Sequence, residues 1–67
     1  MNIREYRRAK GYTQKKASYL LNITDKYLSK IETGKRAPSD RLRSKMAEVY
    51  EVNIEEIFLL TNRTKSS

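Results

Sequence analysis

The sequence contains neither cysteine nor histidine. Disulfides and most zinc sites are therefore excluded, as are the thiol and imidazole groups that often act as nucleophile or general base. No cluster of carboxylates replaces them, and 67 residues leave little room for both a core and an enclosed substrate cavity. We therefore expect a single domain that is not an enzyme and that uses no metal, cofactor or small-molecule ligand.

Long hydrophobic runs are also missing. Residues 57–60 form one of the longest apolar runs, which is far too short to cross a bilayer. Residues 1–10 are polar and charged and lack the apolar segment of a signal peptide. Together with the absence of cysteine, these observations predict a cytoplasmic protein without a membrane partner.

What the sequence has in excess is positive charge. Lysine and arginine number 15 against 8 acidic residues, which gives a net charge of +7 and a pI of about 9.9. A pI above about 9 is typical of nucleic-acid-binding domains, although anionic lipid also attracts a basic chain. Charge alone therefore favours a polyanionic partner but does not distinguish nucleic acid from anionic lipid.

Glycine and proline are scarce, and the two glycines and one proline all fall between segments of helical periodicity. The periodicity predicts an all-α fold of five helices in a domain at residues 1–60, followed by a polar tail at residues 61–67. The expected helices cover residues 2–10, 13–21, 25–33, 39–51 and 53–60, and N-cap residues begin four of them: Thr13, Thr24, Ser39 and Asn53. Gly11 and Asn22 are expected to end the first two in the left-handed conformation.

A short connection joins the second and third expected helices. Residues 22–24 allow only a tight turn, so the two helices should cross at a steep angle. A helix, a short turn and a second helix form the unit in which the second helix enters the major groove of DNA. The spacing therefore predicts a helix-turn-helix unit.

The third expected helix has two distinct faces. Tyr27, Leu28 and Ile31 fall on the side toward the core, and the opposite side carries hydrogen-bonding residues: Asp25, Lys26, Ser29, Lys30 and Thr33. Lysine side chains donate hydrogen bonds to guanine, and aspartate accepts one from the amino group of cytosine. Serine and threonine can contact either base. The face is either a base-reading surface or an ordinary solvated one, and the preceding turn favours base reading.

Arg7 lies in the apolar stripe of the first expected helix, and Glu32 borders the apolar face of the third. A charge on a core face needs a partner, because burying it alone is costly. We therefore predict a structural ion pair between Arg7 and Glu32 that ties the first helix to the third. The alternative is two unrelated surface charges.

The last expected helix has apolar residues on more than one side. Ile54, Ile57 and Phe58 are expected to face the core, which turns Leu59 and Leu60 outward. We predict a homodimer interface at these two leucines. The alternative is that Leu60 folds back over the core and leaves Leu59 as a lone exposed leucine.

The sequence resembles the Cro/CI repressor (XRE-type) helix-turn-helix family, to which the phage lambda repressor belongs. The segments that carry the resemblance keep the family's order and spacing, notably Thr13-Gln14, Ile31-Glu32, Gly34-Lys35-Arg36 and Pro38. The resemblance covers about residues 3–60. It implies a lambda-repressor-like five-helix domain that binds DNA as a dimer.

The resemblance also implies roles by position. It places base reading on Asp25, Lys26, Ser29 and Lys30. It implies phosphate contacts for Gln14, Thr24, Tyr27, Thr33, Lys35 and Arg36. The Arg7–Glu32 pair also matches a salt bridge of the family.

Three further positions qualify this picture. We expect Arg41 or Arg43 to join the phosphate-binding cluster of Lys35 and Arg36. Asp25 is unusual for a base reader, because phosphates repel an acid. Stabilisation of the helix N-terminus, worth about 0.3–1 kcal/mol, is an equal alternative for Asp25.

These features predict a sequence-specific double-stranded DNA-binding transcriptional regulator, most simply a repressor in a bacterial or phage system, that binds a two-fold operator as a homodimer. One other reading is an RNA-binding or nonspecific DNA-binding protein. Single-strand binding requires an exposed aromatic platform, and the five tyrosines are scattered. The other is an antitoxin or protein-interaction module whose main partner is another protein.

Overall fold

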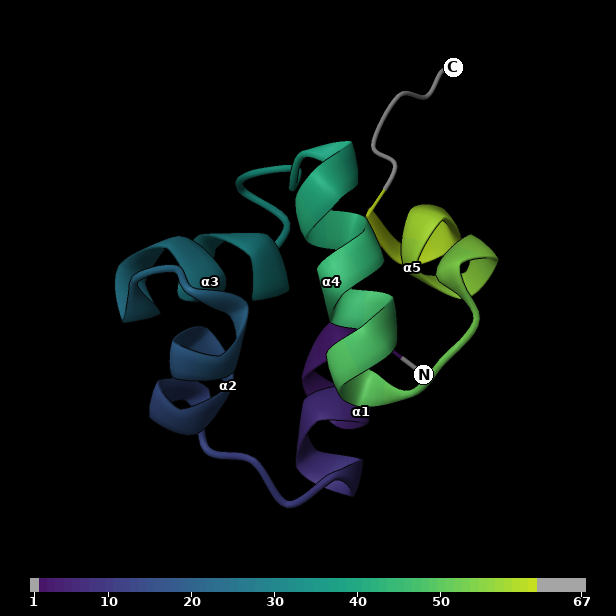
Figure 1. The fold of residues 1–67 in the computed structure, drawn as a ribbon. Helices are drawn as coiled ribbons and strands as arrows, with labels where there is room; N and C mark the ends of the chain where they lie inside the picture. The colour runs from purple at the N-terminus through teal and green to yellow at the C-terminus, as the bar shows by residue number, and fades with distance from the viewer. Residues whose placement is uncertain (1, 62–67) are drawn as a thin grey trace.

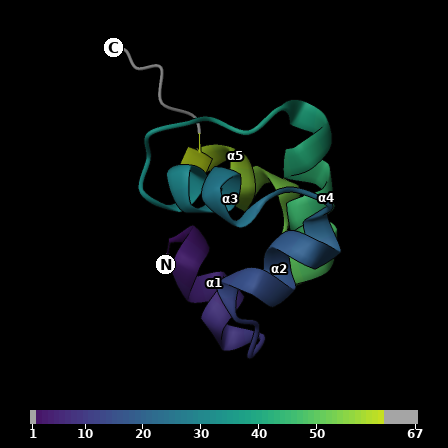
Figure 2. The same cartoon turned by 90° about the vertical axis from the view of Figure 1, so that its left-hand side faces the viewer.

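The computed structural model describes residues 2–61. Within this range the chain forms five α-helices and no β-strand: α1 (Ile3–Ala9), α2 (Gln14–Leu21), α3 (Asp25–Glu32), α4 (Asp40–Tyr50) and α5 (Ile54–Thr61). Helix α4 stands between α2 and α3 on one side and α5 on the other (Figure 1). From the side, α2 and α3 lie in front and α5 lies behind α3 (Figure 2). The all-α prediction is confirmed.

Polar side chains cap the starts of the helices, as the sequence predicts. The hydroxyls of Thr13, Thr24 and Ser39 accept backbone amides of the helices that they precede, at 3.0, 3.1 and 3.2 Å. The side chain of Asn53 accepts an amide of α5 at 2.9 Å. Helix α1 begins one residue later than predicted, because Asn2 is its cap. Each cap stabilises its helix by about 1 kcal/mol.

Left-handed residues end the helices and turn the chain. Gly11 and Asn22 take φ values of 79° and 61°, as expected, and Glu51 takes a φ of 57°. Helix α4 therefore ends at Tyr50 rather than at Glu51. The left-handed turn lets the amide of Val52 bond a carbonyl of α4 at 3.0 Å and places the Glu51 carboxylate 3.1 Å from the ammonium of Lys10.

The core is built from one face of every helix. It contains nine buried apolar residues: Ile3, Ala17, Leu21, Leu28, Ile31, Leu42, Met46, Tyr50 and Ile57. Burying a large apolar side chain stabilises a fold by about 1.5–3 kcal/mol. Because α4 packs on both α2 and α5, its buried face joins the two sides of the molecule.

Tyr50 is among the largest fully buried side chains, with 2% of its surface exposed. Its hydroxyl has no hydrogen-bond partner within the part of the chain that the structure describes. Burial, followed by the negative charge of Glu32, raises the pKa of Tyr50 from 10.0 to about 12. Near pH 10 the unfolded chain therefore loses this proton while the folded chain keeps it.

We expect Tyr50→Phe to be at least as stable as the wild type at neutral pH, with a gain of about 1 kcal/mol, because the change removes an unpaired buried hydroxyl. The raised pKa also means that Tyr50 contributes stability below pH 10 that is lost as the pH rises toward 12. The variant should lose less stability than the wild type over that interval. Urea denaturation followed by circular dichroism measures both effects.

Tyr19→Phe is the matched control, because Tyr19 is 78% exposed. It should keep the alkaline loss of the wild type. A clear loss of stability in Tyr50→Phe at neutral pH would mean that the Tyr50 hydroxyl is hydrogen-bonded in solution.

Candidate nucleic-acid interface

Helices α2 and α3 pack against each other across a tight turn. Ala17 and Ser18, which are 0% and 2% exposed, are the small residues of α2 that lie buried in the fold. The amide of Ile23 bonds the carbonyl of Ser18 at 3.0 Å and closes the turn. Ile23 is half-buried and packs on the edge of the core.

Helix α3 presents a polar face to solvent. Leu28 and Ile31 are buried, whereas Lys26 and Lys30 are exposed and Ser29 is half-buried. Two shallow grooves follow this face. One is lined by Gln14, Asp25, Lys26, Ser29, Lys30, Thr33 and Lys35. The other is lined by Thr24, Lys26, Tyr27, Lys30 and Arg36.

These two grooves hold all ten residues for which the family resemblance implied DNA contacts, whereas Arg41 and Arg43 line neither groove. The residues come from the start of α2, from the turn before α3, from α3 and from the loop after α3. Lys26 and Lys30 line both grooves. The structure therefore brings onto one surface side chains that extend from Gln14 to Arg36 in the sequence.

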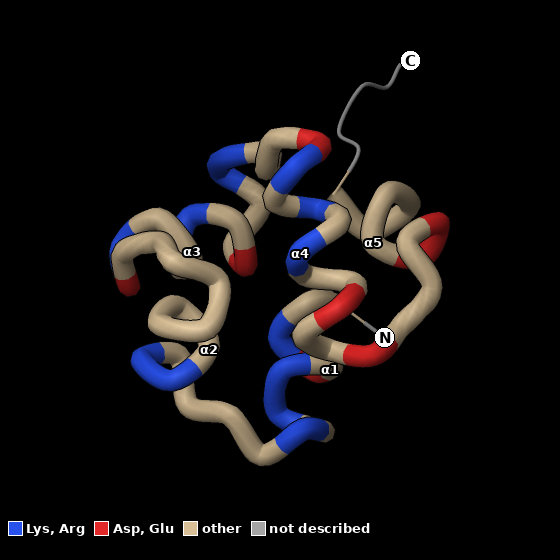
Figure 3. Tube along the Cα trace, in the orientation of Figure 1, with Lys and Arg blue, Asp and Glu red and all other residues tan. Residues whose placement is uncertain are grey.

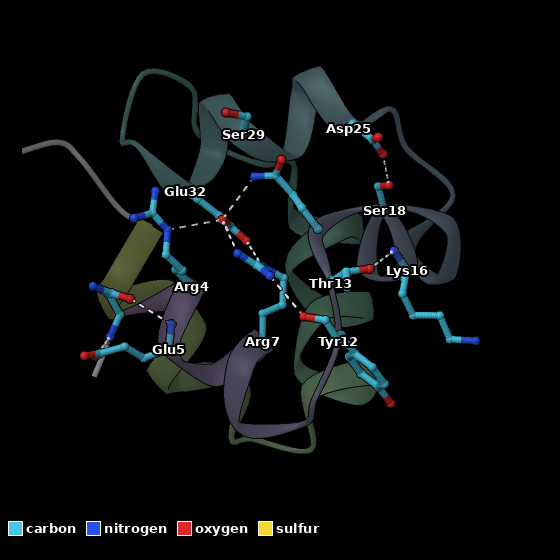
Figure 4. A network of polar contacts seen from close by, with 12 residues as sticks. Arg4, Glu5, Arg7, Tyr12, Thr13, Lys16, Ser18, Asp25, Ser29 and Glu32 are labelled. Atoms are coloured by element: carbon cyan, nitrogen blue, oxygen red, sulfur yellow. Dashed lines mark hydrogen bonds and ion pairs between the residues drawn. The ribbon is translucent and has the colours of Figure 1, made fainter.

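A buried ionic network holds α1, α2 and α3 together. The guanidinium of Arg7 approaches both carboxylate oxygens of Glu32, with Nε at 2.6 Å from Oε2 and Nη2 at 3.2 Å from Oε1 (Figure 4). The side chains are 8% and 0% exposed. Arg7 also donates to the carbonyl of Tyr12 at 3.0 Å, so its charge is well satisfied.

Glu32 also contacts two further side chains. Gln14, the first residue of α2, donates its Nε2 to Oε1 of Glu32 at 3.3 Å. Arg4 places its Nε 3.6 Å from the same oxygen, with 45% of its side chain exposed. The last residue of α3 therefore positions Gln14 beside the polar face of α3.

The loop after α3 folds back on the helix. The amides of Lys35 and Arg36 bond the carbonyl of Lys30 at 2.8 and 3.2 Å. The guanidinium of Arg36 lies 5.5 Å from the ring centre of Tyr27, within the range of a cation–π contact. These contacts hold two basic side chains near the end of α3.

Arg43 does not belong to this basic cluster, so of the two arginines predicted as alternatives Arg41 remains the candidate for a phosphate contact. Its Nε donates to the hydroxyl of Thr61 at 2.8 Å, its Nη2 donates to the Thr61 carbonyl at 3.2 Å, and its Nη1 pairs with Asp40 at 2.9 Å. The guanidinium also lies 4.8 Å from the ring centre of Phe58. Arg43 thus clamps the end of α5 to α4, and of the two arginines considered only Arg41 stays exposed.

Helix α5 differs from the sequence prediction at several positions. Ile57 is buried, but Ile54 is 37% exposed, so its expected place in the core is wrong. Ile54 is the first residue of α5 and has no preceding helical turn to pack beside it. Leu60 is half-buried and packs on the core, whereas Leu59 is 77% exposed. Only the packing of Leu60 therefore matches the alternative that the sequence left open, and the homodimer interface at Leu59 stays a prediction.

Thr61 was assigned to the polar tail, and that assignment is wrong. It is the last residue of α5 and is 4% exposed. Its hydroxyl donates to the carbonyl of Ile57 at 2.6 Å and accepts from Arg43. The remainder of the predicted tail, residues 62–67, lies outside the described residues.

Residues 2–61 form neither a cluster of metal ligands nor a membrane-spanning helix. No group of three or more acidic side chains there is arranged to hold a metal ion. No helix of this part of the chain is long and apolar enough to cross a membrane.

Comparison with known proteins agrees with this geometry. A family model described as helix-turn-helix matches residues 3–57. An uncharacterized HTH-type transcriptional regulator of Bacillus subtilis, YazB, is 36% identical over 55 residues, which cover 82% of this chain and 80% of YazB. An uncharacterized HTH-type transcriptional regulator of Archaeoglobus fulgidus is 35% identical over 57 residues, which cover 85% and 81% of the two chains. No solved structure matches the chain significantly.

The chain therefore belongs to the XRE-type helix-turn-helix family, as its sequence indicated.

Proposed function

We propose that this protein is a sequence-specific double-stranded DNA-binding transcriptional regulator, most simply a repressor, that binds a two-fold operator as a homodimer with α3 in the major groove. The observation that carries the proposal is the convergence of the ten residues lining the two grooves onto one basic surface around α3. The names of the two relatives support the same conclusion.

The size of α3 and the charge around it support insertion into the major groove. A helix with its side chains is about 10–12 Å in diameter, which the major groove, about 12 Å wide, admits. The 8 residues of α3 extend over about 12 Å along the helix axis. Basic residues line both grooves beside α3, whereas the acidic residues Glu48, Glu51, Glu55 and Glu56 gather at the end of α4 and the start of α5 (Figure 3). The lysines and the arginine that line the grooves therefore favour an approach of phosphates on the α3 side, where Asp25 is the acidic residue among the lining residues.

Within this surface we assign base reading to Lys26, Ser29 and Lys30, because they lie on the outward side of α3. Phosphate contacts go to the surrounding residues: Gln14, Thr24, Tyr27, Thr33, Lys35 and Arg36. Thr24 and Thr33 use their hydroxyls inside the fold as well, since Thr24 accepts the amide of Tyr27 and Thr33 donates to the carbonyl of Ser29.

Selection of bound duplexes from a random pool tests the proposal. We expect enrichment of a motif with two-fold symmetry whose half-sites lie about one helical turn apart. Enrichment of an asymmetric motif would overturn the dimeric arrangement. Equal binding of all duplexes would overturn sequence-specific regulation.

Replacing Lys35 and Arg36 with alanine should weaken binding to the selected duplex and to random DNA alike, because phosphate contacts carry no sequence information. Each lost contact should reduce the slope of log affinity against log salt concentration by about 0.9. Titrations at several salt concentrations measure that slope. Lys10→Ala is a matched control, since Lys10 pairs with Glu51 away from α3. A wild-type slope in the double variant would remove both residues from the interface.

A protein-interaction module, such as an antitoxin, is the second candidate. The exposed apolar residues Ile54 and Leu59 on α5 favour it, because such a surface also suits a partner protein. A regulator binds its operator without any partner. Failure of the purified chain to enrich any duplex, together with stable binding of a cellular protein through Leu59, would favour the second candidate.

A further inference from the structure

Ser18 and Asp25 make a contact that neither the sequence analysis nor the family assignment explains. Ser18 is buried in α2, and its hydroxyl donates to Oδ1 of Asp25, the first residue of α3 (Figure 4). The same hydroxyl lies 2.9 Å from the carbonyl of Lys15. The sequence indicates this contact only weakly. Ser18 is a polar residue on the same face of α2 as the buried Leu21.

Only one of the two acceptors can take the proton of Ser18 at a time, because a hydroxyl carries a single hydrogen. The Asp25 carboxylate is the stronger acceptor, since hydrogen bonds to a charged oxygen are shorter and stronger than those to a neutral carbonyl. In this state the side chains of Ser18 and Asp25 link α2 to the start of α3 across the turn. We call this hydrogen bond the Ser18–Asp25 latch.

We propose that Asp25 is a positioning residue and not a base reader: the Ser18–Asp25 latch sets how α3 sits against α2, and base reading falls to Lys26, Ser29 and Lys30. This inference rests on the proposed function. Asp25 brings a negative charge to a surface that faces phosphates, where it opposes binding. A positioning role accounts for that charge, because the carboxylate gains a hydrogen bond from Ser18 and lies at the positive end of the α3 dipole.

The second acceptor makes the latch testable. When Asp25 is replaced, the Ser18 hydroxyl still reaches the carbonyl of Lys15, so no buried polar group is left unpaired. Variants at Asp25 should therefore fold. Thermal denaturation followed by circular dichroism checks that they do, and Ser44→Ala, an exposed serine on α4, serves as the matched control.

The experiment measures two quantities for the selected duplex: the preference at each base pair, and the ratio of affinity for this duplex to affinity for random DNA. The variants are Asp25→Asn, Asp25→Ala, Ser18→Ala and the double alanine variant, with Lys26→Ala as the reference for a base-reading residue. Asparagine keeps an acceptor for Ser18 but removes the charge, so it separates the latch from the charge.

If Asp25 positions α3, Asp25→Asn should keep the wild-type base preferences and bind all duplexes more tightly, by up to about fivefold, because one repulsive charge is gone. Asp25→Ala and Ser18→Ala should each lower the specific-to-random ratio by about three- to tenfold, spread over the half-site. The double variant should be no worse than either single variant, since both remove the same bond.

A different pattern would overturn the inference. If Asp25→Ala or Asp25→Asn alters preference at a single base pair, as Lys26→Ala should, while Ser18→Ala leaves preference and ratio unchanged, Asp25 reads a base. If the wild type itself shows no base preference, the proposed function has failed, and that result is visible before any variant is compared.

Discussion

Glu32→Ala should lower the free energy of unfolding by about 3–5 kcal/mol, because it leaves the guanidinium of Arg7 buried without its counter-charge. Gln14 would lose its hydrogen bond to Oε1 at the same time. A domain this small lies near the lower end of the about 5–15 kcal/mol typical of proteins, so the variant should be close to its unfolding midpoint. Urea and thermal denaturation followed by circular dichroism measure the loss.

Three controls make this result specific. Arg4→Ala should cost under about 1 kcal/mol, because Arg4 is 45% exposed and meets Glu32 at 3.6 Å. Glu48→Ala, which removes an exposed carboxylate of α4, should stay within about 0.5 kcal/mol of the wild type. Replacing both partners, as in Arg7→Met with Glu32→Leu, should recover much of the lost stability, since no buried charge is left unpaired. A loss under about 0.5 kcal/mol in Glu32→Ala would contradict the buried network.

Leu59→Glu should abolish cooperative binding to a duplex with two half-sites while leaving each monomer folded. Leu59 is 77% exposed and packs little within the monomer. In a two-fold dimer it would meet its own copy, and burying each leucine would contribute about 1.5–3 kcal/mol. Loss of both contacts should weaken binding to the full operator by about a hundredfold or more. Gel-shift titration and analytical ultracentrifugation measure the two effects.

Charge is the variable to control in that experiment, because a new glutamate also repels DNA. Leu59→Lys reverses the sign and should still abolish cooperativity, whereas a purely electrostatic effect would strengthen binding. Leu60 is half-buried against the core, so its substitution would confuse interface loss with unfolding. A wild-type protein that stays monomeric at every concentration, and that binds one half-site with full affinity, would exclude the dimer.

Local chemistry made much of the fold predictable. N-cap residues such as Thr13 and Thr24 bond amides within their own helices, and Asn22 adopts its left-handed conformation through its own backbone preferences. The helical period separated the buried Leu28 from the exposed Lys26 because both lie on one helix. The grooves around α3 could be predicted for the same reason: most of their residues come from α3 and the loop that follows it.

A contact between helices could be predicted only where the chemistry of a residue did not suit the face of the helix on which it lies. Arg7 was such a residue, since a charge in an apolar stripe demands a partner. Ser18 and Arg43 were not, because a small hydroxyl suits many environments and a long arginine can reach several neighbours. The pairing of Ser18 with Asp25, and of Arg43 with Thr61, depends on the angle and distance at which two helices pack against each other.

By itself, the sequence determined the helices, the caps of four of them, the polar face of α3 and the ion pair of Arg7 with Glu32. Each follows from local periodicity, from the chemistry of a capping side chain or from a charge on an apolar face. The tertiary structure alone decided that Leu60 covers the core while Leu59 and Ile54 face solvent, and that Arg43 clamps α5. A helical wheel gives the direction of a side chain around its own axis. What lies in that direction is set by the angle and distance of the neighbouring helices.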